Sequence, residues 1–455
     1  MPHPASDRPP PRRHAKAQRV MDRCARLATH TEAPGRITRR YLTPPVAAVH
    51  EDLTRWMRDA GMRVRVDAAG NLVGRLGADH PEVPVLLTGS HIDTVPNGGR
   101  YDGVLGVLVG IAAAEALSRV DLPFALDVVA FSEEEGVRYA KPYLGSAAVA
   151  GRFDPGWLDR TDEQGVTLRD AVTRFGLDPA AIPAAAYDPQ HVLGFIETHV
   201  EQGPVLEQAG RPVGVVNAIA GQSRLLLRFV GEAGHAGTSP MHPRRDALVS
   251  AAHLIAEVQE YGRSIAGLRA TVGHVSAHPN VRNVIPGAVE VSLDVRHAMD
   301  DVRDAAVAAL LDHATRIAGE DGVAVEVLEN QPQPATEMDS GLSGLLSQAM
   351  ADAGHRPFDL LSGAGHDAVA VAAAFPVAML FVRHPGGRSH HPDERVELAD
   401  VAVAVDVLTR AVRLLAGRVR GEDARLPPLP VDLPMPGTMS GAGAIPGAGV
   451  GATPA

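Results

Sequence analysis

The chain has 455 residues, a formal net charge of -11 and 45% hydrophobic residues, enough for two domains with separate cores. The acidic balance argues against a nucleic-acid partner, because contacts with phosphates need clustered Lys and Arg. Cys24 is the single cysteine, so an intrachain disulfide and a cysteine-rich metal site are excluded. Residues 1–13 lack the apolar segment of a signal peptide, and no window approaches the roughly 18 apolar residues of a membrane span. We therefore expect a cytoplasmic protein with no membrane partner.

The first half of the chain has the pattern of an α/β fold with a mostly parallel sheet. Apolar runs at 83–87 and 124–131 flank a helical stretch at 104–119, and this strand–helix–strand order makes a parallel βαβ unit. The remaining elements expected here are a disordered segment over 1–15, helices over 18–29 and 44–60, a hairpin of 62–66 and 71–76, and a strand at 192–200.

The pattern changes near Gly210 and again near residue 330, which predicts an inserted domain over 213–329. Its expected elements are strands at 213–218, 225–230, 270–276, 289–295 and 323–328 and helices at 245–260 and 300–318. Two helices over an antiparallel sheet make a compact α+β unit. The first domain, 16–212, then resumes over 330–418 with a helix at 341–353, a strand at 377–382 and a helix at 398–415, before a low-complexity tail at 419–455.

Metal-capable side chains follow the ends of several predicted strands. Because open α/β sheets keep their sites at the carboxyl ends of parallel strands, we expect these side chains to converge there. They are His91, Asp93, Asp102, Glu133, Glu134, Glu135, His199 and one histidine of the pair His390 and His391. Taken singly, each could be a turn residue or part of a solvated acidic run. Together, the imidazole and carboxylate groups suit two divalent ions that share a carboxylate, with Zn, Mn, Co and Ni all compatible.

Three motifs resemble a known enzyme superfamily. They are Gly89-Ser90-His91-Ile92-Asp93-Thr94-Val95, Glu134-Glu135-Gly136-Val137-Arg138-Tyr139 and His235-Ala236-Gly237-Thr238-Ser239-Pro240-Met241. The chain resembles the dinuclear metal amidohydrolases of the aminoacylase and carboxypeptidase-G superfamily from about residue 18 to about residue 415. It is most similar to the carbamoyl-hydrolysing branch, which includes allantoate amidohydrolase and N-carbamoyl-L-amino-acid hydrolase.

The resemblance implies two divalent metal ions per subunit, Zn or Mn, with Co or Ni also compatible. His91 and His199 would hold one ion, Glu135 and His390 the other, and Asp102 would bridge them. The two parts of the first domain become the catalytic domain, and the insert becomes a lid and dimerisation domain, so a homodimer is expected.

Catalytic and substrate-binding roles follow from the same resemblance. Glu134 would be the general base, Asp93 would orient the His91 ring, and His235 of the lid would stabilise the tetrahedral intermediate in a partner's active site. The expected substrate-binding residues are Asn283, Arg296, Gln202 and Gln222. Arg296 presents a bidentate fork that suits a substrate carboxylate.

The implied reaction is hydrolysis of the carbamoyl C–N bond of a small ureido substrate that carries a carboxylate. The triple glutamate and the stretch from Val215 to Gln222 are most similar to allantoate amidohydrolase. N-carbamoyl-L-amino-acid hydrolase, or a related ureidoglycolate or β-ureidopropionate amidohydrolase, is the alternative. A catalytically silent binding protein on the same fold is a weaker hypothesis, since every ligand position and the base are filled. A dipeptidase is also weaker, because the lid motifs resemble those of the carbamoyl-hydrolysing branch, whereas the metal site would suit either activity. The roles of His366, Asp367, Arg383, His384 and His391 stay open.

Overall fold

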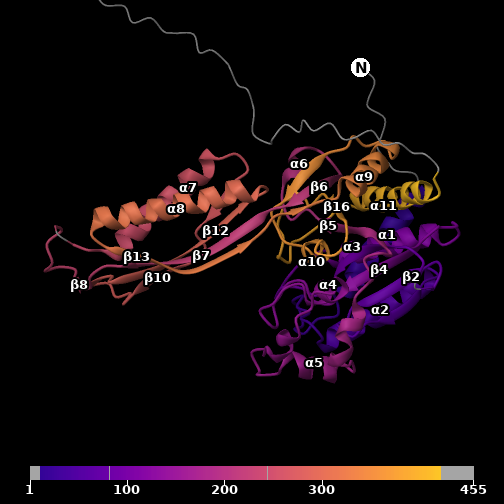
Figure 1. The fold of residues 1–455 in the computed structure, drawn as a ribbon, viewed down its shortest axis with the longest axis horizontal. Helices are drawn as coiled ribbons and strands as arrows, with labels where there is room; N and C mark the ends of the chain where they lie inside the picture. Colours follow the sequence, from indigo (N-terminus) through magenta and orange to yellow (C-terminus); the bar gives the residue numbers. More distant parts are fainter. Residues whose placement is uncertain (1–10, 81, 243, 422–455) are drawn as a thin grey trace, which may run out of the picture. The chain divides into compact units, whose positions relative to one another are not determined.

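A computed structural model describes residues 11–80, 82–242 and 244–421. These residues form two compact units, one built from 11–220 and 334–421 and the other from 221–333. Figure 1 shows helices and strands alternating in the first unit, and long strands with two helices in the second.

A nine-stranded sheet organises the first unit, with strand order β1-β2-β4-β3-β5-β16-β6-β14 and with β15 beside β6. Its strands are β1 (Arg63–Val66), β2 (Leu72–Leu76), β3 (Val85–His91), β4 (Ala125–Phe131), β5 (Val192–Val200), β6 (Val213–Ile219), β14 (Thr336–Glu337), β15 (Asp359–Ser362) and β16 (Val377–Val382). The central strands β4, β3, β5 and β16 run parallel to one another. Their carboxyl ends therefore lie at one edge of the sheet.

Helices cover both faces of this sheet. They are α1 (Pro11–Leu27), α2 (Pro44–Asp59), α3 (Val104–Leu117), α4 (Leu144–Val149), α5 (Leu168–Arg174), α6 (Val205–Gln208), α9 (Ser340–Asp352), α10 (Asp367–Val371) and α11 (Leu398–Val419), with 3-10 turns at Pro155–Asp159 and Pro179–Ala185. One core joins α1, α2, α3, α9 and α11 to strand residues such as Leu86 and Leu126. The other joins α4 and α10 to Leu87 and Phe195. Burial on both faces explains why the central strands read as continuous apolar runs.

The second unit has a five-stranded antiparallel sheet of order β10-β12-β7-β13, with β9 beside β12, and a separate ribbon of β8 and β11. Its strands are β7 (Gly221–Val230), β8 (Gly234–His235), β9 (Arg269–Thr271), β10 (Val275–His278), β11 (Val284–Ile285), β12 (Ala288–His297) and β13 (Ala324–Gln333). Helices α7 (Ala247–Ser264) and α8 (Asp300–Asp321) pack on one face, where the alternate residues of β7 and β12 are buried.

The predicted fold class is confirmed: a mostly parallel sheet with flanking helices, plus an inserted α+β unit. The boundary between the units along the chain differs from the expected one. β6 pairs with β16 and β15, so it belongs to the large sheet. The insert accordingly spans 221–333 and not 213–329. β6 is an apolar run that is buried at all but one residue, and such a run suits either sheet, so its own residues do not tell which sheet it joins.

Smaller differences concern the ends of elements. Helix α1 begins at Pro11, so residues 11–15 are helical and not disordered, whereas residues 1–10 and 422–455 lie outside the described part of the chain. The single strand expected at 270–276 is two strands, β9 and β10. None of the helices in the described ranges is both long and apolar enough to cross a lipid bilayer.

Candidate metal centre

The site is built where β3 ends. His91 is the last residue of β3, and its ring Nδ1 lies 3.1 Å from the backbone oxygen and 3.4 Å from Oδ1 of Asp93. A carbonyl oxygen can only accept, so Nδ1 of the neutral ring donates and Nε2 keeps its lone pair. That Nε2 lies 3.8 Å from Oδ1 of Asp102, in the turn before α3.

His199, near the end of β5, approaches the same oxygen from the neighbouring strand. Its Nδ1 lies 2.9 Å from the backbone oxygen of Val200, which again leaves Nε2 as the free ring nitrogen. His199 Nε2 is 3.1 Å from Asp102 Oδ1 and 3.4 Å from His91 Nε2. Two imidazole nitrogens and one carboxylate oxygen therefore point at a common position.

The second oxygen of Asp102 faces a different pair of side chains. His390 Nε2, from the segment after β16, lies 3.3 Å from Asp102 Oδ2 and 3.7 Å from Glu135 Oε2. The amide group of Gln202 donates to both Asp102 oxygens at 3.2 Å. Asp102 thus presents one oxygen to each of two groups, which is the arrangement of a bridging carboxylate.

The three glutamates follow the end of β4, and Asp93 holds the backbone of two of them. Asp93 Oδ1 accepts the backbone N–H of Glu134 at 3.0 Å, and Oδ2 accepts that of Glu135 at 3.1 Å. Glu133 instead closes its own turn by accepting the backbone N–H of Gly136. Asp93 therefore links the turn after β3 to the turn after β4.

The donor set fits two divalent cations. Ligand atoms lie within 4.8 Å of one another in three groups: His91, Asp102 and His199; Asp102, Glu135 and His390; and His91, Glu134 and Glu135. Oε1 of Glu135 is buried and has no hydrogen-bond partner among the described residues. Imidazole and carboxylate ligands of this kind suit Zn, Mn, Co or Ni.

The electrostatics of the glutamates support the same fit. Burial raises the pKa of Glu134 well above its ordinary value, and burial together with the nearby Asp102 raises the pKa of Glu135 to about 7. Within the described residues, no lysine or arginine forms an ion pair with either carboxylate. Burial favours the neutral form of both groups, and the added positive charge of a divalent ion would favour the ionised form that a ligand or a base needs.

The turn that carries Asp102 depends on Gly103. This residue has a φ of 66°, and a Cβ atom built on it would lie 2.5 Å from the backbone oxygen of His91 and 2.6 Å from its ring. Its backbone N–H donates to His199 Nε2 at 3.3 Å. Glycine here lets α3 begin directly beneath the two histidines.

The remaining predicted site residues lie in the second unit. His235 on β8 is exposed, and its Nδ1 accepts the backbone N–H of Gly237 and Thr238 at 3.1 and 3.2 Å. Asn283 adjoins β11, which pairs with β8, and its backbone oxygen accepts from Ala236 at 2.9 Å. His235 and Asn283 are therefore neighbours, as members of one small ribbon.

Arg296 and Gln222 lie opposite one another on β12 and β7. The guanidinium of Arg296 makes two hydrogen bonds to the carboxylate of Asp294, at 2.7 and 2.8 Å. The amide of Gln222 donates to Gln333 Oε1 at 2.7 Å. A fork that holds Asp294 in this way has the geometry needed to hold another carboxylate.

The residues left without a role are the buried His366, Asp367 and His384, together with Arg383 and His391. His366 and His384 are fully buried: His366 Nε2 lies 2.9 Å from Ser362 Oγ, and its ring packs edge-on against His199 at 4.5 Å. Arg383 makes a two-point ion pair with the buried Asp400, which makes it a structural residue. His391 is half exposed and is not among the groups of ligand atoms close enough for a shared ion.

Two functional contacts could not be found from sequence. Gln202 was expected to bind substrate, and its contact with Asp102, to which its amide donates, was not anticipated. Glu394 was not singled out at all, yet it contacts the backbone of Tyr101 and Asp102. Nothing in the spacing of Glu394 signals this, because its partners are about three hundred residues away and meet it only in the folded sheet.

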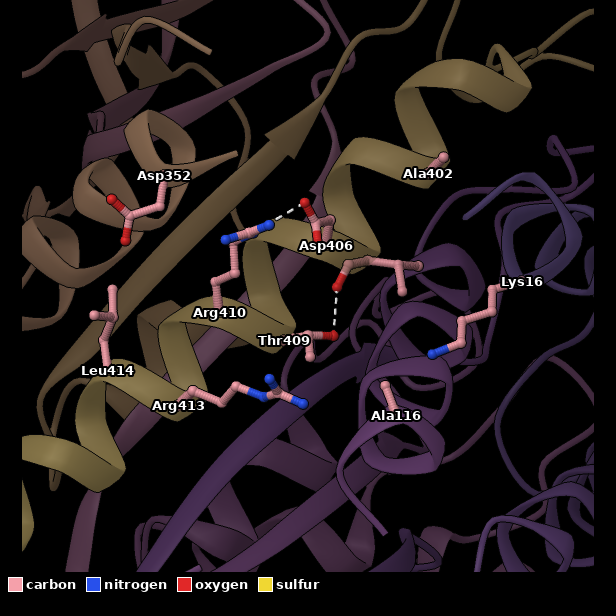
Figure 2. Close-up of a pocket in the computed structure, with 10 residues that line it drawn as sticks. Lys16, Ala116, Asp352, Ala402, Asp406, Thr409, Arg410, Arg413 and Leu414 are labelled. Atoms are coloured by element: carbon pink, nitrogen blue, oxygen red, sulfur yellow. Dashed lines mark hydrogen bonds and ion pairs between the residues drawn. The ribbon is translucent and has the colours of Figure 1, made fainter. Parts of the chain in front are cut away.

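One cavity of about 580 Å³ lies elsewhere, on the helical face formed by α1, α3, α9 and α11. Figure 2 shows Arg410 paired with Asp406 at its wall and Arg413 and Lys16 along its sides. None of its lining residues belongs to the groups of candidate metal ligands. The chemistry therefore has to be sought at the strand ends and not in this cavity.

The chain is similar in sequence to several characterised enzymes. The profile of peptidase family M20/M25/M40 matches residues 87–414. N-carbamoyl-L-amino acid amidohydrolase of Geobacillus stearothermophilus is 38% identical over 404 residues, which cover 88% of this chain and 99% of that protein. Allantoate deiminase 1 of Glycine max is 37% identical over 414 residues, covering 83% and 85%. Allantoate amidohydrolase of Bacillus subtilis (strain 168) is 35% identical over 391 residues, covering 84% and 94%.

Solved structures agree with the sequence relatives. A hydantoinase/carbamoylase family amidase from Burkholderia ambifaria has a TM-score of 0.81 at 36% identity, covering 88% of this chain and 98% of that one. An amidase of the same family from Burkholderia multivorans has a TM-score of 0.80 at 33% identity, covering 87% and 97%. Enzymes of this family generally depend on two metal ions, for which the chain has candidate ligands. The chain thus belongs to peptidase family M20/M25/M40, among its amidohydrolases.

Proposed function

We propose that this protein hydrolyses the ureido C–N bond of a small substrate that also carries a carboxylate. The observation that best supports this is the placement of Asp102, whose two oxygens face His199 at 3.1 Å and His390 at 3.3 Å. A carboxylate shared in this way suits two-metal hydrolysis of an amide-type bond.

The proposed ligands of the first ion are His91 and His199, those of the second are Glu135 and His390, and Asp102 is shared. Zn or Mn is the proposed metal, and Co or Ni also suits these ligands. When bound, such ions lower the pKa of a water molecule and polarise the carbonyl group that it attacks.

The chain's own groups would move the protons. Glu134 is the proposed general base: it takes a proton from the attacking water and returns it to the leaving nitrogen. The C–N bond to the leaving nitrogen breaks, which gives the free amine and carbamic acid. The carbamic acid then decomposes to carbon dioxide and ammonia. His235 is the proposed donor to the developing oxyanion, a contact worth roughly 3–4 kcal/mol.

We propose that Arg296 binds the substrate carboxylate, with Gln222 opposite it on β7. Asn283, which lies beside His235 in the β8/β11 ribbon, is a second proposed substrate contact. The Arg296 fork already holds the carboxylate of Asp294, so a substrate would compete with that residue or share the fork with it. Gln202 would act closer to the metals, through the Asp102 contact described above.

Allantoate is the first candidate substrate, because the Glu133–Glu135 run and Gln222 match that branch and relatives named allantoate deiminase and allantoate amidohydrolase cover most of the chain. An N-carbamoyl-L-amino acid is the second candidate, favoured by the relative from Geobacillus stearothermophilus, 99% of which is matched. Both substrates carry a ureido group and a carboxylate, so the proposed machinery serves either.

Metal-loaded protein should be incubated separately with allantoate, N-carbamoyl-L-amino acids and dipeptides, while ammonia and free amine are measured. We expect ammonia to appear from at least one ureido substrate and no turnover of dipeptides. The substrate with the highest kcat/KM decides between the two candidates. Absence of turnover with every ureido compound would contradict the proposal.

A further inference from the structure

Glu394 is a buried glutamate with no place in the proposed chemistry. It lies in the segment between β16 and α11, four residues after His390, and only 4% of it is exposed. It does not belong to any group of ligand atoms close enough for a shared ion. Its surroundings therefore call for another explanation of a buried carboxylate.

One carboxylate oxygen of Glu394 is committed to the turn that carries Asp102. Oε2 accepts the backbone N–H of Tyr101 at 2.7 Å and that of Asp102 at 3.1 Å. These two hydrogen bonds are shielded from water, so removing the acceptor would leave two buried N–H groups without a partner. The two bonds hold the backbone of the bridging residue directly.

The turn is also shaped to admit this carboxylate. A Cβ atom on Gly99 would lie 2.0 Å from Oε2 of Glu394, 2.3 Å from Cδ and 2.4 Å from Cβ. Any other residue at this position would therefore push Glu394 away. The side chain of Glu394 thus occupies the space that the missing side chain of Gly99 leaves, although the two residues are far apart in the sequence.

The same glutamate fixes the segment that carries the last ligand. Its backbone N–H donates to the backbone oxygen of His391 at 3.0 Å, closing a turn next to His390. His390 has a φ of 56° and a side chain that is 49% exposed, so its own packing restrains it weakly. Its Nε2 nevertheless lies 3.3 Å from Asp102 Oδ2.

We infer that Glu394 is a positioning residue that ties the His390 segment to the Asp102 turn and so holds the bridging carboxylate between its two groups of ligands. This inference rests on the proposed two-metal function. It assigns no contact with substrate to Glu394. It requires an oxygen acceptor at the position of Oε2 and does not require a negative charge there.

Two substitutions separate the acceptor from the charge. Glu394→Ala removes the acceptor, and we expect it to weaken metal binding about 10–100-fold, as loss of a partner behind a ligand does. Glu394→Gln keeps an oxygen that can accept both N–H groups, so its metal affinity should stay within about threefold of the wild-type value. Affinity is measured by competition with a chelator using Zn²⁺ and Mn²⁺ separately, and amide exchange of Tyr101 and Asp102 is followed in the same samples.

Gly99→Ala changes the other member of the Gly99–Glu394 pair. It provides a second test if the Glu394→Ala variant folds poorly. Because it displaces the carboxylate, it should weaken metal binding to a similar degree. Combined with Glu394→Ala, it should add little, since both changes break one interaction. Asp246→Ala is the matched control: Asp246 Oδ1 also accepts two backbone N–H groups, at 3.0 and 3.3 Å, but at the start of α7. It should leave metal affinity unchanged.

The outcomes are distinguishable. Weak metal binding in Glu394→Ala and Gly99→Ala, with near-normal binding in Glu394→Gln and faster amide exchange at Tyr101 and Asp102 in Glu394→Ala, supports the inference. Unchanged affinity in Glu394→Ala overturns it, and so does a Glu394→Gln variant as weak as Glu394→Ala. If the wild-type protein itself binds no metal, the proposed function fails, and the inference fails with it.

Discussion

Asp102 has its position because three separate parts of the chain meet around it. His91 and His199 come from adjacent parallel strands, and His390 comes from the segment after β16. The hydrogen bonds to these histidines outweigh burial and hold the pKa of Asp102 well below its usual range. An ionised carboxylate with one oxygen toward each group is the form that a bridging ligand needs.

The proposed base can be separated from the ligands by substitution. Glu134→Gln keeps the size of the side chain but cannot take a proton, so kcat should fall by about 10²–10⁴-fold. Metal content, measured by elemental analysis of the purified protein, should stay at two ions per chain. Glu163→Gln, a change at an exposed position, is the control and should be fully active. Loss of an ion from Glu134→Gln would mean that Glu134 is a ligand.

At the scale of elements, the position of the site depends on a buried arginine that binds the backbone of the turn after β3. Arg39 is 1% exposed and donates to the backbone oxygens of Ile92 at 2.6 Å, His30 at 3.0 Å and Leu27 at 3.1 Å. It therefore joins the end of α1 to the residue that follows His91. Buried backbone oxygens need a hydrogen-bond donor, and in this irregular stretch the guanidinium of Arg39 donates to three of them.

Arg39→Met should lower the free energy of unfolding by about 2–5 kcal/mol, because three buried carbonyl oxygens lose their donor. The measurement is the urea midpoint, followed by circular dichroism. Arg36→Met is the matched control, since the side chain of Arg36 is exposed, and its midpoint should not move. Equal midpoints for both variants would refute the structural role of Arg39.

His50 on α2 gives the fold a dependence on pH. Its ring packs edge-on against Phe175 at 5.7 Å, and burial lowers its pKa to about 4. An unfolded chain takes up this proton near pH 6.5, so His50 costs stability as the pH falls from about 6.5 to about 4. Between pH 7 and pH 5 this should amount to about 2 kcal/mol.

His50→Leu removes the titrating group and keeps an apolar side chain in contact with the Phe175 ring. The difference between the urea midpoints at pH 7 and pH 5 should therefore shrink relative to the wild-type protein. The value at pH 7 alone is uninformative, because the substitution also changes packing. A pH dependence that is the same in both proteins would show that His50 is not the responsible group.

At the scale of the molecule, the candidate residues divide between two units. The metal-ligand candidates and Glu134 belong to the first unit, whereas His235, Asn283, Arg296 and Gln222 belong to the second. We propose that the active enzyme is a homodimer in which His235 serves the site of the partner chain. Such sharing makes activity depend on the assembly and not only on each chain.

Mixing two inactive variants tests the sharing. Glu134→Ala and His235→Ala should each be nearly inactive alone, yet a refolded equimolar mixture should regain about a quarter of the wild-type activity, because half of the dimers then contain one intact site. Sedimentation velocity should show a dimer in every sample. If the mixture stays inactive although mixed dimers are present, His235 does not act across the dimer.

The sequence by itself determined the class of fold and the identity of the metal-capable residues. Continuous apolar runs mark buried parallel strands, and side chains placed just after such strands must gather at one edge of the sheet. His91, Asp102, Glu135, His199 and His390 could therefore be named from motifs and strand ends, and the structure brings them together. No long-range contact has to be known for this, because these residues lie at the ends of parallel strands or in the segments that follow them. His91 and His199 lie in β3 and β5, whereas Asp102, Glu135 and His390 follow β3, β4 and β16.

Only the tertiary structure decided how these residues are held. The two oxygens of Asp102, the double role of Asp93 and the buried Glu394 depend on contacts between segments far apart in the chain. The same is true of β6, whose place in the large sheet follows from its pairing with β16 and not from its own residues. Hydrogen-bond partners across such distances leave no periodic signal in sequence, since they are chosen by the packing of the folded sheet.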